Sequence, residues 1–368
     1  LSGNYQLRGR DPLYYDPFKQ QWYNTIDSLS LPNPSSYFPH PKRSMLKYGA
    51  NAFINYKPKD KMEFSFSSGF QDSEVQTSNF DVSSNINTFL SKSHYFDLRS
   101  SAYGLTTHLS HNRGFQWPIA GYRGGSFNFS TTDVSAEYEL KINKLSLKPE
   151  LSYRSAMYDD TKLWDASKKE GILNARRYME TYGGTLRSEY YLLNDKVRLT
   201  GGVRFDKFTH PGKWFVSYQA ASGIKINKQN LVRLVYSRAF RSPFIYDTYQ
   251  DIQFSFPLGT VPEMFIVNHM QGNKNIDLLS SNMFELGYRN KITSNLSIDI
   301  EGYTIKTENY TGLIAGRTDQ TPESFPLIME THFQIQNIPL WIQQNGITFS
   351  VNYLSRSFQL KPFITFQQ

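Results

Sequence analysis

Polar and apolar residues alternate along much of this chain, and the clearest example is the segment 281–308. Two alternating runs flank a short polar turn at 290–295. In the second run three aliphatic residues alternate with three polar ones: Leu296, Ile298 and Ile300 against Ser297, Asp299 and Glu301. Successive side chains of a strand point to opposite faces of its sheet. The segment therefore predicts a β-hairpin with one apolar and one charged face.

Similar hairpins recur along the chain, and their tight turns alternate with longer connections. The predicted turns lie at 57–61, 103–104, 142–144, 193–196, 227–230, 290–295 and 354–357. Residues 1–45, which are rich in proline, and the segments 156–177, 242–279 and 309–345 are expected to be long loops, and no helical element is expected. Short turns on one side and long loops on the other are typical of outer-membrane barrels.

The predicted fold is therefore an all-β, transmembrane antiparallel β-barrel with short periplasmic turns and long extracellular loops. We expect about 14 or 15 strands of about ten residues, which is the length of a tilted membrane crossing. The charged faces would line a wet lumen, because a charged residue facing lipid at the bilayer midplane costs about 2–4 kcal/mol. By itself a single hairpin would equally suit a soluble sandwich, and it is the repetition that favours the barrel.

Composition narrows the alternatives. The chain has 368 residues and a mean hydropathy of −0.52, without a run of about 20 apolar residues that could form a membrane helix. It contains no cysteine, which excludes disulfides, thiolate metal sites and cysteine nucleophiles. The net charge of +8 is spread over scattered basic residues, which argues against a nucleic-acid partner.

Four motifs carry a resemblance to a known family. They are Tyr236–Pro243 (YSRAFRSP), Gly272–Ile276 (GNKNI), Phe284–Arg289 (FELGYR) and Gly201–Asp206 (GGVRFD). With these motifs the chain resembles the barrel of a TonB-dependent outer-membrane receptor, in particular those of the Bacteroidetes. Many members have Asn-Pro and Lys-Pro-Glu before the third motif, whereas this chain has Asn273-Lys274 and Leu278-Leu279-Ser280.

The resemblance implies a 22-stranded barrel, an N-terminal plug and a periplasmic segment that contacts TonB. No part of the chain resembles the plug or that segment. Residues 1–368 are therefore expected to form one incomplete barrel domain, with the plug and the last strands outside the sequence. The implied function is import of a scarce nutrient across the outer membrane of a Gram-negative bacterium, the nutrient being an iron chelate, a cobalamin or a glycan fragment.

The implied partners are TonB, acting through the absent plug, the lipid and lipopolysaccharide of the outer membrane, and a small-molecule or oligomeric ligand. Surface or periplasmic proteins are further expected partners. Two other functions stay open at this point. A receptor-like barrel could serve as a structural or assembly partner in a larger envelope complex, or the chain could form a passive diffusion porin.

Candidate site residues come from the expected outer loops and the strand ends. The ligand-binding candidates are aromatic or arginine residues: Trp117, Tyr122, Arg123, Trp164, Tyr246, Tyr249, Phe254 and Phe256. The candidates for facing the plug are Arg204, Arg233, Arg238 and Arg241. The competing interpretations are an interfacial aromatic girdle for the first set and barrel-wall ion pairs for the second.

Little in the sequence predicts metal binding or catalysis. Asp159, Asp160 and Asp165 do not have the spacing of a calcium loop, and a solvated acidic turn explains them better. The seven histidines show no paired metal spacing, and no serine lies in a nucleophile elbow. We expect no cofactor, no metal site and no enzymatic activity.

Overall fold

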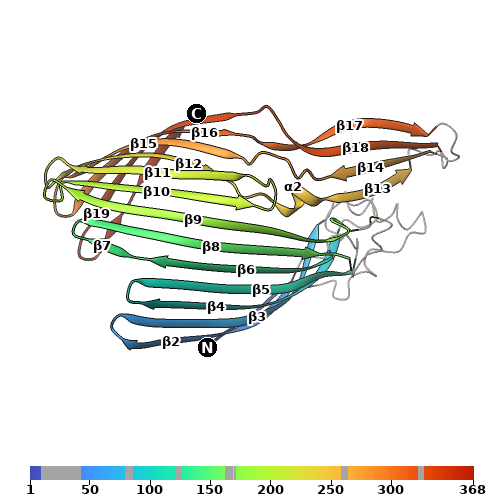
Figure 1. Ribbon diagram of the computed structural model, residues 1–368, viewed down its shortest axis with the longest axis horizontal. Coiled ribbons are helices and arrows are strands. Elements are labelled where there is room, and N and C mark those ends of the chain that lie inside the picture. The colour runs from blue at the N-terminus through green and yellow to red at the C-terminus, as the bar shows by residue number, and fades with distance from the viewer. Residues whose placement is uncertain are drawn as a thin grey trace.

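The computed structural model describes residues 1–9, 43–78, 86–120, 126–161, 169, 171–257, 264–321 and 327–368. Nearly all of these residues lie in β-strands that build one large, curved wall (Figure 1). A smaller, four-stranded sheet extends from one end of this wall. No helix in the described part of the chain is long and apolar enough to cross a membrane.

The wall contains 17 strands. They are β1 (Ser2–Gly9), β2 (Arg43–Lys59), β3 (Met62–Ser78), β4 (Ile86–Ala102), β5 (Leu105–Ala120), β6 (Phe127–Tyr138), β7 (Leu140–Ile142), β8 (Leu145–Asp159), β9 (Arg176–Leu192), β10 (Val197–Phe208), β11 (Trp214–Lys225), β12 (Asn230–Phe240), β15 (Ser280–Lys291), β16 (Leu296–Glu308), β19 (Ile342–Leu354), β20 (Gln359–Leu360) and β21 (Phe363–Gln367).

Strands that follow one another in the sequence pair antiparallel, so the wall is a meander. In the described part of the chain, β12 pairs with β15 and β16 with β19, across the segments that contain the second sheet. Both β6 and β7 pair with β8, and both β20 and β21 pair with β19. The 17 strands therefore occupy 15 positions across the sheet, in agreement with the predicted 14 or 15.

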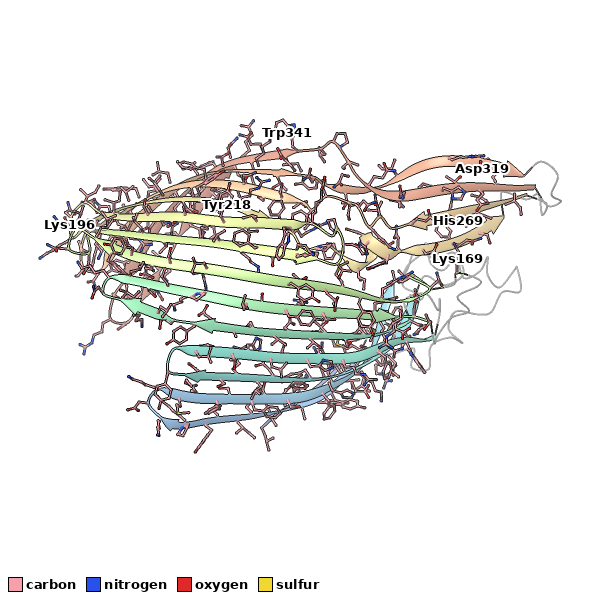
Figure 2. The ribbon with its side chains drawn as sticks, in the orientation of Figure 1. Lys169, Lys196, Tyr218, His269, Asp319 and Trp341 are labelled. Atoms are coloured by element: carbon pink, nitrogen blue, oxygen red, sulfur yellow. The ribbon has the colours of Figure 1, made fainter. Side chains whose placement is uncertain are left out.

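All seven predicted tight turns are present, and they lie together at one end of the wall, on the left of Figure 1. Several turn residues adopt positive φ angles, as tight hairpins require. In the two-residue turn at 103–104, Tyr103 has φ 50° and Gly104 has φ 91°. Figure 2 shows Lys196, from one of these turns, at the opposite end of the molecule from Asp319 in the smaller sheet.

The alternation of the sequence becomes two chemically different faces of the wall. On one face large apolar side chains are exposed and lie opposite one another on neighbouring strands, as Leu234 does with Leu286 and Ile300 with Phe349. On the other face Arg233 forms ion pairs with carboxylates of the next two strands. An exposed apolar face of this extent requires an apolar solvent, which agrees with the predicted lipid-facing surface.

The charged face is also the hollow one. A cavity of about 740 Å³ opens across β1–β5 and is lined mainly by polar side chains, among them Asn51, Asn55, Ser65, Ser67 and Asp97. These residues lie on the same face of the wall as the charged residues. Residues directly opposite each other in a ladder share a face, and the ladder partners of this group include Arg99 and Ser110. The polar face is therefore the interior of the wall, as predicted for a wet lumen.

Several expectations are wrong in detail. Residues 2–9 form β1, which pairs with β2, although residues 1–45 were expected to be loop. The prolines of that stretch begin at Pro12, and Asn4, Gln6 and Arg8 alternate with Tyr5 and Leu7 before them. Many wall strands have 11 to 17 residues instead of about ten, so they extend beyond a membrane crossing.

The long segments 242–279 and 309–345 are not loops without secondary structure. They contain a short helix, α2 (Ile245–Tyr249), and four strands: β13 (Asp251–Pro257), β14 (Met264–Gln271), β17 (Thr311–Thr321) and β18 (Leu327–Asn337). The strand order is β13–β14–β18–β17, and the central pair β14–β18 is parallel. This second sheet therefore joins two connections that are far apart in the sequence.

Candidate functional site

Helix α2 lies at the end of the wall opposite the tight turns, directly after β12 (Figure 1). Its position is fixed by Gly272, because a Cβ atom there would lie 2.5 Å from the carbonyl carbon of Thr248. The amide of Asn273 donates a hydrogen bond of 2.9 Å to the carbonyl oxygen of Asp247. Gly272 and Asn273 of the GNKNI motif thus pack directly against the backbone of α2 and fix the position of Tyr249.

The ring of Tyr249 is surrounded by nitrogen-containing side chains. The Arg177 guanidinium lies 5.4 Å from the ring centroid and the Lys274 ammonium 5.7 Å from it. The His210 imidazole meets the ring edge-on, at 5.5 Å between centroids and 79° between planes. The Tyr249 hydroxyl donates to the carbonyl oxygen of Tyr178 at 3.3 Å. Cations over an aromatic face are attracted by its quadrupole, so this arrangement holds two cations on one ring.

The local electrostatics keep this cluster positive. Burial, together with the nearby Lys274 ammonium, lowers the pKa of His210, so its imidazole is neutral at neutral pH. Burial raises the pKa of the Tyr249 phenol, which also stays neutral. Burial raises the pKa of Asp247 too, although the Arg241 guanidinium 3.6 Å away opposes that shift. Arg177 and Lys274 therefore carry the charge that a ligand meets here.

An aromatic surface continues from this cluster along the interior face. The rings of Phe127 and Tyr158 stack at 4.6 Å between centroids, and Phe129 lies 6.1 Å from Phe127. Tyr158 is the ladder partner of Arg177, and the two side chains share the face of the interior carboxylates. Aromatic rings from β6 and β8 and cations from β9 and the loop before β15 therefore lie together at this end of the wall.

Comparison with known proteins decides the family. A family model described as "TonB dependent receptor-like, beta-barrel" matches residues 2–365. The chain belongs to this family. It is thus a barrel of a Gram-negative outer membrane, in which the tight turns face the periplasm and α2 and the second sheet face the outside. The family consists of receptors and transporters and not of enzymes, in agreement with the sequence. No curated protein gives a significant match.

Solved receptors share the fold at low sequence identity. The siderophore receptor PirA from Pseudomonas aeruginosa has a TM-score of 0.64 at 12% identity, over 88% of this chain and 56% of PirA. A mutant of the ferric enterobactin receptor PfeA from the same organism has a TM-score of 0.69 at 12% identity, over 88% and 51%. The outer membrane transporter YddB from Escherichia coli has a TM-score of 0.59 at 11% identity, over 88% and 48%. The chain spans about half the length of these receptors.

The eight ligand-binding candidates are distributed unevenly over the receptor. Tyr249 lies in the cationic cluster, and Tyr246 on the same helix is 42% exposed. Trp117 is in β5, on the apolar face, where its ring contacts Phe115. Phe254 lies in β13 of the second sheet. Four candidates lie outside the described residues or have undescribed side chains: Tyr122, Arg123, Trp164 and Phe256.

The four plug-facing candidates occupy different environments. Arg204 donates from Nε to both carboxylate oxygens of Asp206, at 2.9 and 2.8 Å, and Arg233 pairs with Glu285 and Glu301 on the same interior face. Arg241 stacks on Phe244 and approaches Asp247. Arg238 lies on the same face of β12 as Leu234 and Tyr236, which is the apolar face, and its guanidinium lies 5.0 Å from the Phe240 ring. Contact of these arginines with a plug stays a prediction.

The acidic segment after β8 is not a solvated turn. Asp160 is fully buried, and its carboxylate accepts hydrogen bonds from the backbone amides of Leu173, Asn174 and Ala175. Asp159 accepts from the amide and hydroxyl of Thr161. Asp165 lies outside the described residues. The sequence alone does not show that this carboxylate holds a loop, because its donors are backbone amides 13 to 15 residues away.

Sequence reasoning also missed most of the cluster around Tyr249. The sequence pattern singles out neither Arg177 nor His210, and Lys274 enters it only as a departure from the family motif. The position of Arg177 on the charged face could have been predicted, because it is an even number of residues from Arg187 in β9 and therefore lies on the same face. His210 and Lys274 come from two separate connections, and no periodic pattern joins them.

Proposed function

We propose that this receptor imports an anionic small molecule that carries planar groups, and that an iron chelate fits it best among the expected ligands. The observation that carries the proposal is the position of Arg177 and Lys274 near the Tyr249 ring, 5.4 and 5.7 Å from its centroid, at the outer mouth. A cation pair suits carboxylate or catecholate oxygens, and aromatic rings suit planar groups. A neutral glycan would use neither charge. The names of the similar receptors PirA and PfeA, a siderophore receptor and a ferric enterobactin receptor, support the same choice.

The interior wall supports passage of such a ligand beyond the mouth. Its arginines are largely paired with carboxylates of neighbouring strands, as Arg187 is with Glu137 and Arg198 with Glu189. Paired charges leave a polar but locally neutral surface that does not trap an anion. Capture would therefore take place at Arg177 and Lys274 near Tyr249, which form no ion pair with a described residue, and release into the lumen would follow movement of a plug energised by TonB.

The test is uptake of ⁵⁵Fe-loaded catecholate and hydroxamate chelates by cells that produce the complete receptor. We expect saturable uptake that requires TonB. Arg177→Gln should raise the chelate concentration for half-maximal uptake by about 10- to 100-fold, because one charge-assisted contact to the anionic ligand is lost. The matched control is Arg198→Gln, because Arg198 lies 6.0 Å from the ring of Tyr191 at the periplasmic end. That variant should behave like the wild type.

Other outcomes point to the alternative functions. Uptake that rises in proportion to concentration and persists without TonB would contradict the importer and indicate a porin. Loss of an envelope complex in a deletion strain, with unchanged iron uptake, would indicate the scaffold role. TonB-dependent uptake of a cobalamin or a glycan, without uptake of any ferric chelate, would contradict the proposed ligand class but not the proposed import.

We also propose that these residues are the barrel portion of a longer receptor. The chain covers only about half the length of the similar receptors, and among the described strands β1 and β21 each pair on one side only. A β-sheet in lipid must satisfy its edges by closure. The polypeptide purified from outer membranes should therefore have an intact mass well above 42.7 kDa. A mass equal to that value would contradict the proposal.

A further inference from the structure

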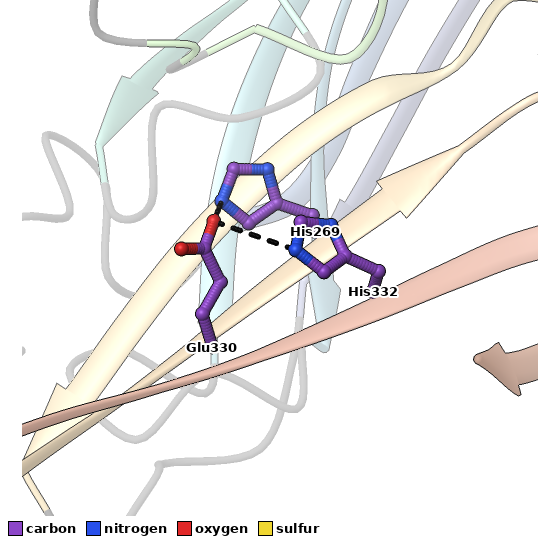
Figure 3. A group of neighbouring side chains, drawn as sticks. All are labelled: His269, Glu330 and His332. Atoms are coloured by element: carbon purple, nitrogen blue, oxygen red, sulfur yellow. Dashed lines mark ion pairs between the residues drawn. The ribbon is translucent and has the colours of Figure 1, made fainter. Parts of the chain in front are cut away.

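Three metal-ligating side chains meet in the second sheet, on the parallel pair β14–β18. His269 of β14 is the direct ladder partner of His332 of β18, so both imidazoles stand on the same face. Glu330 precedes His332 by two residues and shares that face as well. Figure 3 shows the carboxylate of Glu330 beside the two rings. The histidines are 63 positions apart in the sequence, which is why spacing alone shows no metal motif.

The distances fit a common ligand for the three groups. One ligand atom from each side chain can be chosen so that all three lie within 4.8 Å of one another. The Nε2 atom of His269 lies 2.5 Å from Oε1 of Glu330, and Nε2 of His332 lies 3.9 Å from the same oxygen. Bonds of about 2.0–2.2 Å from one ion to these atoms need shifts on the order of 1 Å in the side chains.

The His269 imidazole also has an unsatisfied nitrogen. Its side chain is 13% exposed, and Nε2 is buried without a hydrogen-bond partner among the described residues, although Oε1 of Glu330 lies close to it. A buried polar atom without a partner costs free energy. A cation bound between the three groups would give this nitrogen the partner that it lacks in the present arrangement.

A second carboxylate lies at the edge of the group. Asp319 of β17 is the ladder partner of Glu330, and its Oδ2 atom lies 3.8 Å from Nε2 of His332. Two carboxylates directly opposite each other repel unless a cation lies near them. Arg317 forms an ion pair with Asp319, whereas among the described residues Glu330 forms ion pairs only with the two imidazoles. A metal ion would neutralise Glu330.

We propose that His269, Glu330 and His332 bind a divalent transition-metal ion, for which Zn²⁺ is the representative case. Two imidazoles and a carboxylate are a ligand set that Zn²⁺ and its neighbours in the transition series accept, whereas Mg²⁺ and Ca²⁺ require oxygen ligands. The ion would cross-link the two extracellular connections that supply β14 and β18. The site is separate from the Tyr249 cluster, and its occupation does not depend on which ligand the receptor transports.

The experiment uses the complete receptor purified in detergent and stripped of metal with a chelator. Zn²⁺ titrated by calorimetry should bind saturably, with one ion per chain in the second sheet, and Co²⁺ should give visible absorption bands of a nitrogen- and oxygen-ligated site. His269→Ala, His332→Ala and Glu330→Gln should each weaken Zn²⁺ binding by about 100-fold or more, since loss of even an outer-shell contact costs about 10- to 100-fold.

The matched control is His108→Ala. His108 is a single histidine beside a carboxylate, with Nε2 2.6 Å from Oδ2 of Asp97 on the barrel interior, and among the described residues no second imidazole joins this pair. This variant should bind Zn²⁺ like the wild type. Glu330→Gln keeps size and shape, so its loss of binding cannot be attributed to failed folding of the sheet.

Hydrogen exchange measured on the same samples tests the cross-link itself. Zn²⁺ should slow exchange of the amides of β14 and β18 in the wild type and in the His108 variant, and should have no effect in the three site variants. Absence of saturable binding in the wild type would overturn the proposal. Unchanged binding in the site variants, or binding without slower exchange in β14 and β18, would overturn it as well.

Discussion

Replacing Leu286 by lysine is expected to lower the free energy of unfolding of the barrel by about 2–4 kcal/mol. Leu286 lies near the middle of β15 and is 48% exposed, between Leu234 of β12 and Gly302 of β16 in the ladder. The neighbouring outward side chains Phe284 and Tyr288 are also exposed and apolar or aromatic. A lysine at this depth of the lipid face has no water and no carboxylate within reach.

The measurement is the midpoint of urea unfolding for the receptor refolded into lipid vesicles. The control is Ser350→Lys in β19, which introduces the same charge on the interior face, where Ser350 is the ladder partner of Asp299. That variant should unfold within about 1 kcal/mol of the wild type, as is usual for exposed ion pairs. Equal destabilisation by both lysines would contradict the assignment of the two faces.

The two faces and the hairpins could be predicted because their determinants are local. Each tight turn joins strands adjacent in the sequence, and the parity of Arg233 against Leu234 follows from neighbouring residues alone. The register of each hairpin then places the charges on one face and the aliphatic side chains on the other. The strand count was correct for the same reason, since most wall strands pair with a strand that is adjacent in the sequence.

The outer end of the receptor could not be predicted, because its contacts are long-range. The parallel pairing of β14 with β18 joins segments that two wall strands separate, and no alternation within either segment reveals the partner. The same holds for the approach of Arg177 and Lys274 to Tyr249. β1 was missed for another reason, since the prolines after it dominated the composition of the first 45 residues.

Replacing Asp160 by alanine is expected to detach segment 171–175 from the end of β8. The carboxylate accepts from the amides of Leu173 at 2.8 Å, Asn174 at 3.1 Å and Ala175 at 2.9 Å, and an unpaired buried amide costs about 1–3 kcal/mol. Because the segment is a connection, we expect it to open locally and to be hydrated, while the barrel stays folded. Hydrogen exchange of the three amides should accelerate by about 30-fold or more, the equivalent of about 2 kcal/mol.

The opening should also weaken ligand capture, because the segment braces the strand that follows Tyr249. Ile172 accepts a hydrogen bond of 2.9 Å from the amide of Asp251, and the Asn174 side chain donates to the Asp251 carbonyl oxygen. Once these contacts are lost, β13 no longer holds the end of α2, so the chelate concentration for half-maximal uptake should rise together with the exchange rate. Asp195→Ala, at a turn carboxylate that is 63% exposed and 3.7 Å from Lys144, should change neither quantity. Faster exchange with unchanged uptake would show that Tyr249 is held by Gly272 and Asn273 alone, and unchanged exchange would contradict the role of Asp160.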